Sequence, residues 1–199
     1  MDMSVKEMLE YGSYVRPCPG ESVSGDSVVA KRLDDVLFVA IVDVLGHGQE
    51  AHELSLVIDS YLSRYGSADV LGVILRLHQH LKGTRGAAVG LCAIHKDSYR
   101  LDYVGVGNTS IRRFGSVETR LVSKDGVLGQ NMRTPLLQTL QLEPGDVIVL
   151  YSDGISDRFS VDDYPGALSH PPQNVATNIV QRFGKNHDDA TCIAVRRVP

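Results

Sequence analysis

Short apolar runs bounded by turn-forming residues recur along the chain, and they predict a protein rich in strands. The most apolar of these runs are 36–42, 86–94, 147–151 and 190–195. Runs of this length between turn signals are typical of strands buried on both faces. The segment 99–104 alternates between apolar and polar positions, as a half-exposed strand does. Weaker patterns predict further strands at 22–30, 111–114, 117–122 and 136–142.

Three segments have the 3.6-residue spacing of an amphipathic helix. The first covers 49–65 and ends at Gly66, and the second covers 70–81, with Ser67 as its expected N-cap. The third opens at Pro171-Pro172, because proline is favoured in the first turn of a helix, and ends at Gly184. Residues 10–16 are too short and mixed to predict an element, and 157–170 predicts irregular chain with one short helical turn.

Composition limits the classes of function. The chain has 199 residues, a net charge of −4 and 43% hydrophobic residues, so we expect one globular domain rather than a nucleic-acid or membrane binder. Its three cysteines are far apart in sequence, which favours a reducing compartment over a disulfide framework. The N-terminal residues lack the apolar region of a secretory signal, and no apolar stretch is long enough to span a membrane. A cytoplasmic protein is expected.

Aspartates flank the predicted strands at four places: Asp26, Asp43, Asp153 and the pair Asp188-Asp189. A tight hairpin of 22–30 and 36–42 would bring Asp26 and Asp43 to the same edge of a sheet. Each aspartate alone is also typical of a turn at a strand end. Together, converging carboxylates require a positive partner, and an all-oxygen ligand set selects a hard divalent ion such as Mg²⁺ or Mn²⁺.

The turn after Asp43 permits a rival interpretation. Gly46-His47-Gly48-Gln49-Glu50-Ala51 fits the G-x-G-x-x-A pattern of a dinucleotide-binding module. Asp43 would then place a negative charge near the pyrophosphate, and the following helix precedes a second helix rather than a strand. Both features disfavour this alternative.

Six motifs in order carry a resemblance to a known family. They are Gly25-Asp26, Asp43-Val44-Leu45-Gly46-His47-Gly48, Gly107-Asn108, Leu142-Glu143-Pro144-Gly145-Asp146, Tyr151-Ser152-Asp153-Gly154-Ile155 and Asp188-Asp189-Ala190-Thr191. Their order resembles that of the metal-dependent serine/threonine protein phosphatases of the PPM, or 2C, type. The bacterial branch that controls sigma-factor partner switching and sporulation is the more similar one.

The resemblance implies an α+β fold, a four-layer α-β-β-α sandwich of two mainly antiparallel sheets flanked by helices. It implies a single phosphatase domain over 1–199, with motifs across 22–198 and no separate regulatory domain. The implied activity is removal of phosphate from serine or threonine of phosphorylated STAS-domain stressosome proteins, both scaffold and antagonist, by a monomeric negative regulator of stress signalling. The alternatives are a phosphatase of an anti-anti-sigma factor and a catalytically degenerate binding protein.

The resemblance also implies the roles of individual residues. Two divalent ions, Mn²⁺ or Mg²⁺, would be bridged by Asp43, and the Val44 carbonyl would face the second ion. Asp153 and Asp188 would hold the first ion, and Asp26 would act through a water molecule. Asp189 ranks below Asp188 as a ligand.

One position departs from the family pattern. Many eukaryotic relatives have a histidine two residues after the bridging aspartate, as a proposed general acid, whereas this chain has Leu45 there. The proton donor is left open between a metal-bound water and His47, and His47 is also typical of a helix-entry residue. The phosphate-binding cation is open among Lys31, Arg32 and Arg85.

Overall fold

The computed structural model describes residues 8–156, 159–160 and 166–199, which form two five-stranded antiparallel sheets. The first sheet has the strand order β2 (Asp26–Arg32), β3 (Val36–Val44), β4 (Ala87–His95), β5 (Arg100–Val106) and β8 (Gln138–Gln141). The second has the order β1 (Leu9–Arg16), β10 (Ala190–Arg197), β9 (Val147–Tyr151), β6 (Ser110–Phe114) and β7 (Thr119–Leu121).

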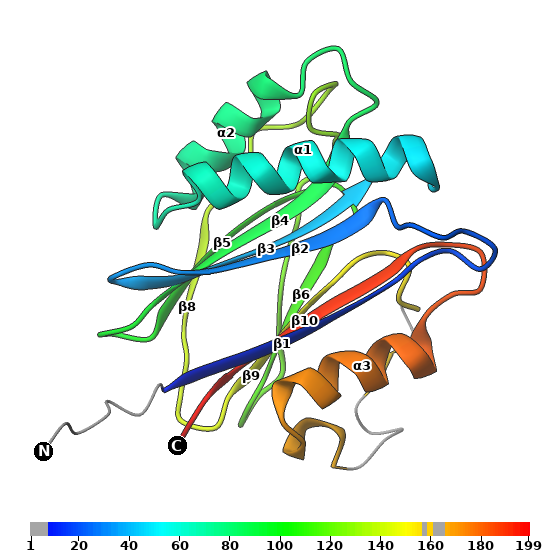
Figure 1. Cartoon of the computed structure of the whole chain (residues 1–199). Coiled ribbons are helices and arrows are strands. Elements are labelled where there is room, and N and C mark those ends of the chain that lie inside the picture. The colour runs from blue at the N-terminus through cyan, green and yellow to red at the C-terminus, as the bar shows by residue number, and fades with distance from the viewer. Residues whose placement is uncertain (1–7, 157–158, 161–165) are drawn as a thin grey trace, which may run out of the picture.

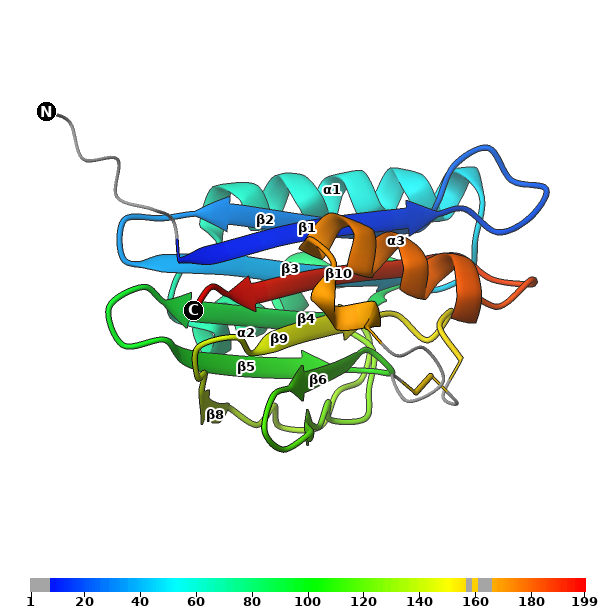
Figure 2. The ribbon, with the colours of Figure 1, turned by 90° about the horizontal axis from the view of Figure 1, so that it is seen from below.

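Helices cover the outer face of each sheet (Figure 1). Helices α1 (Gln49–Tyr65) and α2 (Val70–His80) lie on the first sheet, and α3 (Pro172–Phe183) lies on the second. A short 3₁₀ turn, η1 (Ala167–Ser169), precedes α3. In the view of Figure 2, the strands of the two sheets lie along nearly the same axis. This is the expected α-β-β-α sandwich. Among the described helices, none has the length and apolar character needed to cross a membrane.

Each interface between layers has its own apolar core. The one between the two sheets includes Leu37, Ile41 and Leu150, which are fully buried. The one under α1 and α2 includes Phe38, Ile58 and Leu77, and the one under α3 includes Val149 and Ile179. Because alternate residues of β3 enter different cores, the whole strand is buried except for partial exposure at Asp43. That explains why its sequence is a continuous apolar run rather than an alternating one.

Several sequence predictions require correction. Residues 9–16 form a strand, β1, which the mixed pattern did not indicate because it pairs only with β10, at the edge of its sheet. Strand β5 is buried after its first residue rather than half exposed, because its polar Asp102 is satisfied internally. The N-cap of α2 is Asp69, whose side chain accepts from Gly72 N, rather than Ser67. Much of the predicted irregular stretch 157–170 lies outside the described residues.

Candidate active site

The predicted hairpin forms, and it pairs the first two candidate aspartates directly. Asp26 begins β2 and Asp43 stands one residue before the end of β3, and the two are Cα partners in the antiparallel ladder. Asp153 follows the end of β9, and Asp188 precedes the start of β10, which is the neighbour of β9 in the second sheet. The four aspartates therefore lie at one end of the sandwich, which we call the acidic end.

Asp26 is held across the gap between the sheets by Ser152. The Ser152 hydroxyl donates to Asp26 Oδ2 at 2.6 Å. Ser152 Oγ in turn accepts from Thr191 N at 3.1 Å. Ser152 is 1% exposed and Asp26 is 5% exposed. The hydroxyl thus links a backbone N–H of the second sheet to a carboxylate of the first through two hydrogen bonds. It is too buried to serve as a nucleophile.

Asp153 and Asp43 differ in how their oxygens are satisfied. The Asn108 side chain donates to Asp153 Oδ2 at 2.6 Å, at the end of β5. By contrast, Oδ2 of Asp43 is buried and has no hydrogen-bond partner among the described residues. A buried carboxylate oxygen without a donor is costly unless a cation binds it.

The electrostatics of the acidic end favour neutral carboxyls or an added cation. Burial, together with the charges of Asp26, Asp153 and Asp188, raises the pKa of Asp43 to about 9. Burial also raises the pKa of Asp26 to about 7, with a further increase from Asp189 and Asp188, against the hydrogen bond from Ser152. Burial and the charge of Asp153 raise the pKa of Asp188. Mutual repulsion of this kind is what a bound divalent ion relieves.

The donor set fits a hard divalent cation by its chemistry. It consists of carboxylate oxygens, which are the ligands that Mg²⁺ and Mn²⁺ prefer. One of these oxygens, Asp43 Oδ2, is buried and unpaired. In the described part of the chain, no three His, Cys, Asp or Glu side chains are already grouped around a single point. Asp26 and Asp153 are instead hydrogen-bonded to Ser152 and Asn108.

Asp189 has a different role from its neighbour Asp188. Its Oδ1 accepts from Cys18 N at 2.7 Å and its Oδ2 accepts from Gly25 N at 2.8 Å. With both oxygens engaged and 3% exposure, it ties the 17–25 loop to the start of β10. The ranking of Asp189 below Asp188 as a ligand stays a prediction.

The glycine turn after Asp43 forms as its sequence predicts. Gly46 has φ 83° and Gly48 has φ 78°, a region that L-residues with side chains rarely adopt. Between them, His47 is exposed, and its Nδ1 lies 3.0 Å from Glu21 Oε1. His47 therefore borders the acidic end but faces Glu21.

Of the three candidate phosphate-binding cations, only Arg85 lies at the acidic end. It donates to the Leu45 carbonyl at 3.1 Å and forms an ion pair with Glu50. Lys31 and Arg32 stand at the opposite end of β2, where they donate to the carbonyls of Ser63 and Leu9.

Two supporting side chains, Ser152 and Asn108, escaped residue-by-residue reasoning from the sequence. Both stand inside the motifs quoted above, next to Asp153 and after β5, so the motifs mark their positions without indicating a role. Their partners are 126 and 45 residues away in the chain, and only the fold reveals those contacts.

Comparison with known proteins decides the family. The family model described as "Stage II sporulation protein E (SpoIIE)" matches residues 34–198. The chain belongs to the SpoIIE family. Phosphoserine phosphatase RsbX of Bacillus subtilis (strain 168) is 31% identical over 139 residues, which make up 69% of this chain and 70% of that protein. This SpoIIE-family chain is therefore a phosphatase of the PPM type.

Solved structures agree with the assignment. One similar structure comes from work on the bacterial stressosome as a modular system that has been adapted to control secondary messenger signaling. It has a TM-score of 0.85 and 26% sequence identity, and the match covers 94% of this chain and 99% of the other. The crystal structure of RsbX in complex with magnesium has a TM-score of 0.79 and 25% identity, with 94% of each chain covered. The antiparallel sheets also exclude the dinucleotide-binding alternative, which requires a parallel βαβ unit.

Proposed function

We propose that this SpoIIE-family protein is a metal-dependent phosphatase of phosphoserine and phosphothreonine in stressosome proteins that carry STAS domains. The observation that carries the metal requirement is the buried, unpaired Oδ2 of Asp43 among like-charged carboxylates. The identity to RsbX and the likeness to a stressosome structure support the substrate class. The chain would reset the stress-signalling complex, as a monomer in the cytoplasm. The free, buried state of its three cysteines is compatible with that compartment.

The ligand assignment follows the motifs and the geometry of the acidic end. Asp43 would bridge two ions, with the Val44 carbonyl on the second. Asp153 and Asp188 would hold the first ion, and Asp26 would act through a water molecule. Two divalent ions, Mn²⁺ or Mg²⁺, would supply an activated water nucleophile and neutralise the phosphoryl charge. The magnesium in the RsbX structure supports a divalent ion.

The protein's own residues then position these groups. Ser152 keeps the carboxylate of Asp26 directed between the sheets, and Asn108 orients that of Asp153. Asp189 fixes the loop that delivers Gly25 and Asp26. Arg85, beside the Leu45 carbonyl, is the cation best placed to attract a phosphate, provided that it leaves Glu50.

Hydrolysis of p-nitrophenyl phosphate tests the chemistry. We expect turnover with Mn²⁺ that EDTA abolishes, and a loss of kcat of at least about a thousandfold, or ~4 kcal/mol, in Asp43→Asn or Asp153→Asn. Asp34→Asn is the matched control, since Asp34 is exposed in the turn at the other end of the β2–β3 hairpin. Activity that is insensitive to EDTA would contradict the metal mechanism, and a wild-type protein without turnover would instead support a degenerate binding protein.

The substrate requires a separate experiment. Phosphorylated scaffold and antagonist STAS proteins would be incubated with the enzyme, and phosphate loss would be followed residue by residue. We expect loss from stressosome proteins. If only a phosphorylated anti-anti-sigma factor lost its phosphate, the second candidate function, activation in partner switching, would replace the first.

A further inference from the structure

A pocket of about 430 Å³ lies beside the acidic end. Its apolar wall is formed by Leu45, Ala88 and Val127, and its polar groups are the side chains of Asn108 and Asp125. The remaining wall is backbone, at Gly107 and Gly126. The assigned ligands do not line this pocket.

The pocket is continuous with the candidate active site on two sides. Ala88 is the direct Cα partner of Asp43 across the β3–β4 ladder, and Leu45 follows Asp43 by two residues. On the other side, Asn108 donates to Asp153. A polypeptide that brings a phosphorylated side chain to the aspartates can therefore place a neighbouring side chain in this pocket.

The far wall of the pocket is a preformed surface rather than a mobile lid. The 122–135 loop that carries Asp125 and Val127 is hydrogen-bonded to β4 and β5, through paired bonds between Ala87 and Leu128 and bonds of Lys124 with Gly105 and Gly107. Leu128 is fully buried in the core beneath α1 and α2. A rigid wall costs little conformational entropy when a ligand binds.

Two glycines allow the backbone segments around the pocket to pack closely. Gly107 has φ 97°, and a Cβ there would stand 2.4 Å from the Cβ of Ala88. Gly126 has φ 143°, and a Cβ there would stand 2.5 Å from the Cα of Met132. The walls can approach each other this closely only because both positions lack a side chain.

We propose that this pocket is a specificity subsite that receives an apolar side chain of the substrate polypeptide, one or two residues from the phosphorylated serine or threonine. Neighbouring residues of an extended chain are about 3.3–3.6 Å apart, so side chains within two positions reach a pocket adjoining the aspartates. The exposed carboxylate of Asp125, 3.7 Å from the exposed Arg133, adds a weaker preference against an acidic residue at the same position. The inference rests on the proposed phosphatase function and concerns the sequence around the phosphorylated residue.

Phosphoserine peptides test the subsite. In a serine-rich host peptide, leucine, alanine and glutamate would each be placed at the two positions on either side of the phosphoserine. We expect leucine at one position to raise kcat/KM by about tenfold over alanine, mainly through KM, since filling a pocket with a few methylenes is worth that much. Glutamate at that position is expected to be the poorest, and Asp125→Asn to relieve part of its penalty.

Three variants separate the pocket from the chemistry. Leu45→Ala and Val127→Ala should remove most of the leucine preference while p-nitrophenyl phosphate turnover stays within about twofold, because that ester has no flanking residue. Val122→Ala is the matched control, since Val122 is 59% exposed and outside the pocket. Anisotropy of a labelled phosphopeptide bound to an Asp43→Asn background measures the same preference without turnover.

The outcomes distinguish the two proposals. Turnover of p-nitrophenyl phosphate with no leucine preference at any position, or a preference that survives both alanine variants, would overturn the subsite and leave the phosphatase in place. Absence of turnover on the ester and on every peptide would overturn the phosphatase proposal, and the subsite with it.

Discussion

Two buried aspartates toward opposite ends of the first sheet show how the same side chain serves different purposes. Asp26, at the acidic end, is 5% exposed, and Asp102, in β5, is 7% exposed. Burial alone would raise the pKa of both. Burial, with a smaller contribution from the charges of Asp189 and Asp188, raises the pKa of Asp26 to about 7 against the hydrogen bond from Ser152, whereas the donors around Asp102 lower its pKa.

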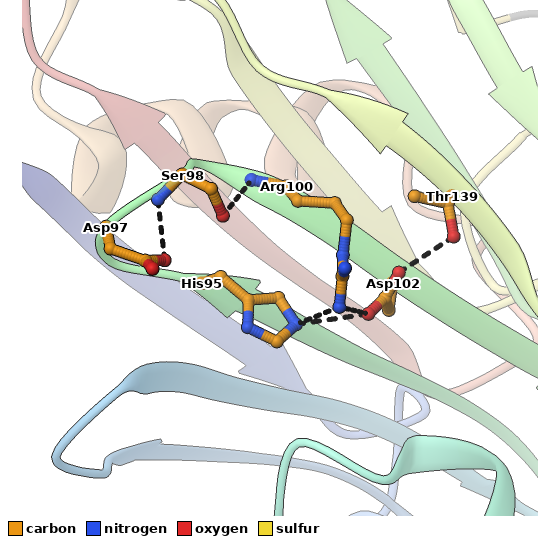
Figure 3. A network of polar contacts seen from close by, with 6 residues as sticks. All are labelled: His95, Asp97, Ser98, Arg100, Asp102 and Thr139. Atoms are coloured by element: carbon orange, nitrogen blue, oxygen red, sulfur yellow. Dashed lines mark hydrogen bonds and ion pairs between the residues drawn. The ribbon is translucent and has the colours of Figure 1, made fainter.

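The environment of Asp102 is drawn in Figure 3. Its Oδ1 accepts from Thr139 Oγ1 at 2.7 Å, and its Oδ2 accepts from Arg100 at 2.8 Å and lies 3.1 Å from His95 Nε2. Burial raises the pKa of Asp102, but the hydrogen bonds from Thr139, His95 and Arg100 outweigh burial, and the pKa ends below its ordinary value. A carboxylate with all its donors supplied by the protein stabilises the fold. A buried carboxylate that lacks hydrogen-bond donors, such as Asp43, indicates a ligand.

The same substitution at the two ends should have opposite effects on stability, and the larger effect is expected at the acidic end. Asp43→Asn should raise the metal-free free energy of unfolding at pH 8 by about 2 kcal/mol, or roughly 4–8 °C in Tm, because the wild-type carboxylate must take up a proton when it is buried at that pH and asparagine need not. Thermal denaturation in EDTA measures it. A lower Tm than that of the wild type at pH 8 would contradict the assignment.

The pH dependence follows from the direction of the shift. Folded Asp43 keeps its proton to a pH of about 9, whereas an unfolded aspartate releases it near 4. Between those values the folded state holds more protons, so the stability is fully present below about pH 4 and is lost as the pH rises toward 9. Metal-free wild-type protein should accordingly lose Tm between pH 5.5 and 8.5, with a smaller loss in Asp43→Asn. Adding Mn²⁺ at pH 8 should restore the Tm of the wild type only.

Asp102→Asn should lower the free energy of unfolding by about 1–2 kcal/mol, since it weakens hydrogen bonds to Arg100 and His95 at a buried position. Urea denaturation of the two asparagine variants side by side provides the measurement. Phosphatase activity and its Mn²⁺ requirement should not change in Asp102→Asn. A change in metal affinity would show that the two ends of the molecule are coupled.

Ser152→Ala should give the smallest effect of the three, about 1 kcal/mol of stability, because Asp26 loses one donor and Thr191 N one acceptor. A positioning role further predicts a several-fold higher Mn²⁺ concentration for half-maximal activity. Ser60→Ala, at an exposed position on α1, is the control. Reduced stability with an unchanged Mn²⁺ requirement would leave Ser152 with a purely structural role.

The comparison also explains what the sequence could predict. The long apolar runs and the helical spacing of 49–65 identify the central strands and helices, because burial on both faces leaves a pattern that does not depend on distant partners. The pairing of Asp26 with Asp43 could also be predicted, because the two strands of the hairpin are adjacent in the chain.

Other features depend on residues that are far apart in sequence. The edge strand β1 has only one neighbour and a mixed pattern, so its existence depends on β10. Asp102 looked like the polar side of an exposed strand, and only the pairing of β5 with β8 adds Thr139 to the nearby Arg100 and His95. The family resemblance supplied the roles of Asp153 and Asp188. Neither periodicity nor spacing could have distinguished Asp188 from Asp189.

The tie made by Asp189 has a consequence for how the protein reaches its native state. Its carboxylate accepts hydrogen bonds from Gly25 and Cys18 across 164 and 171 positions of sequence. Such contacts form slowly, because a long loop must close before they stabilise anything. During synthesis, the β2–β3 hairpin would emerge with Asp26 and Asp43 long before β10 reaches them. The nascent chain would therefore carry Asp26 and Asp43 without the tie from Asp189, and the acidic end would be complete only when β10 docks.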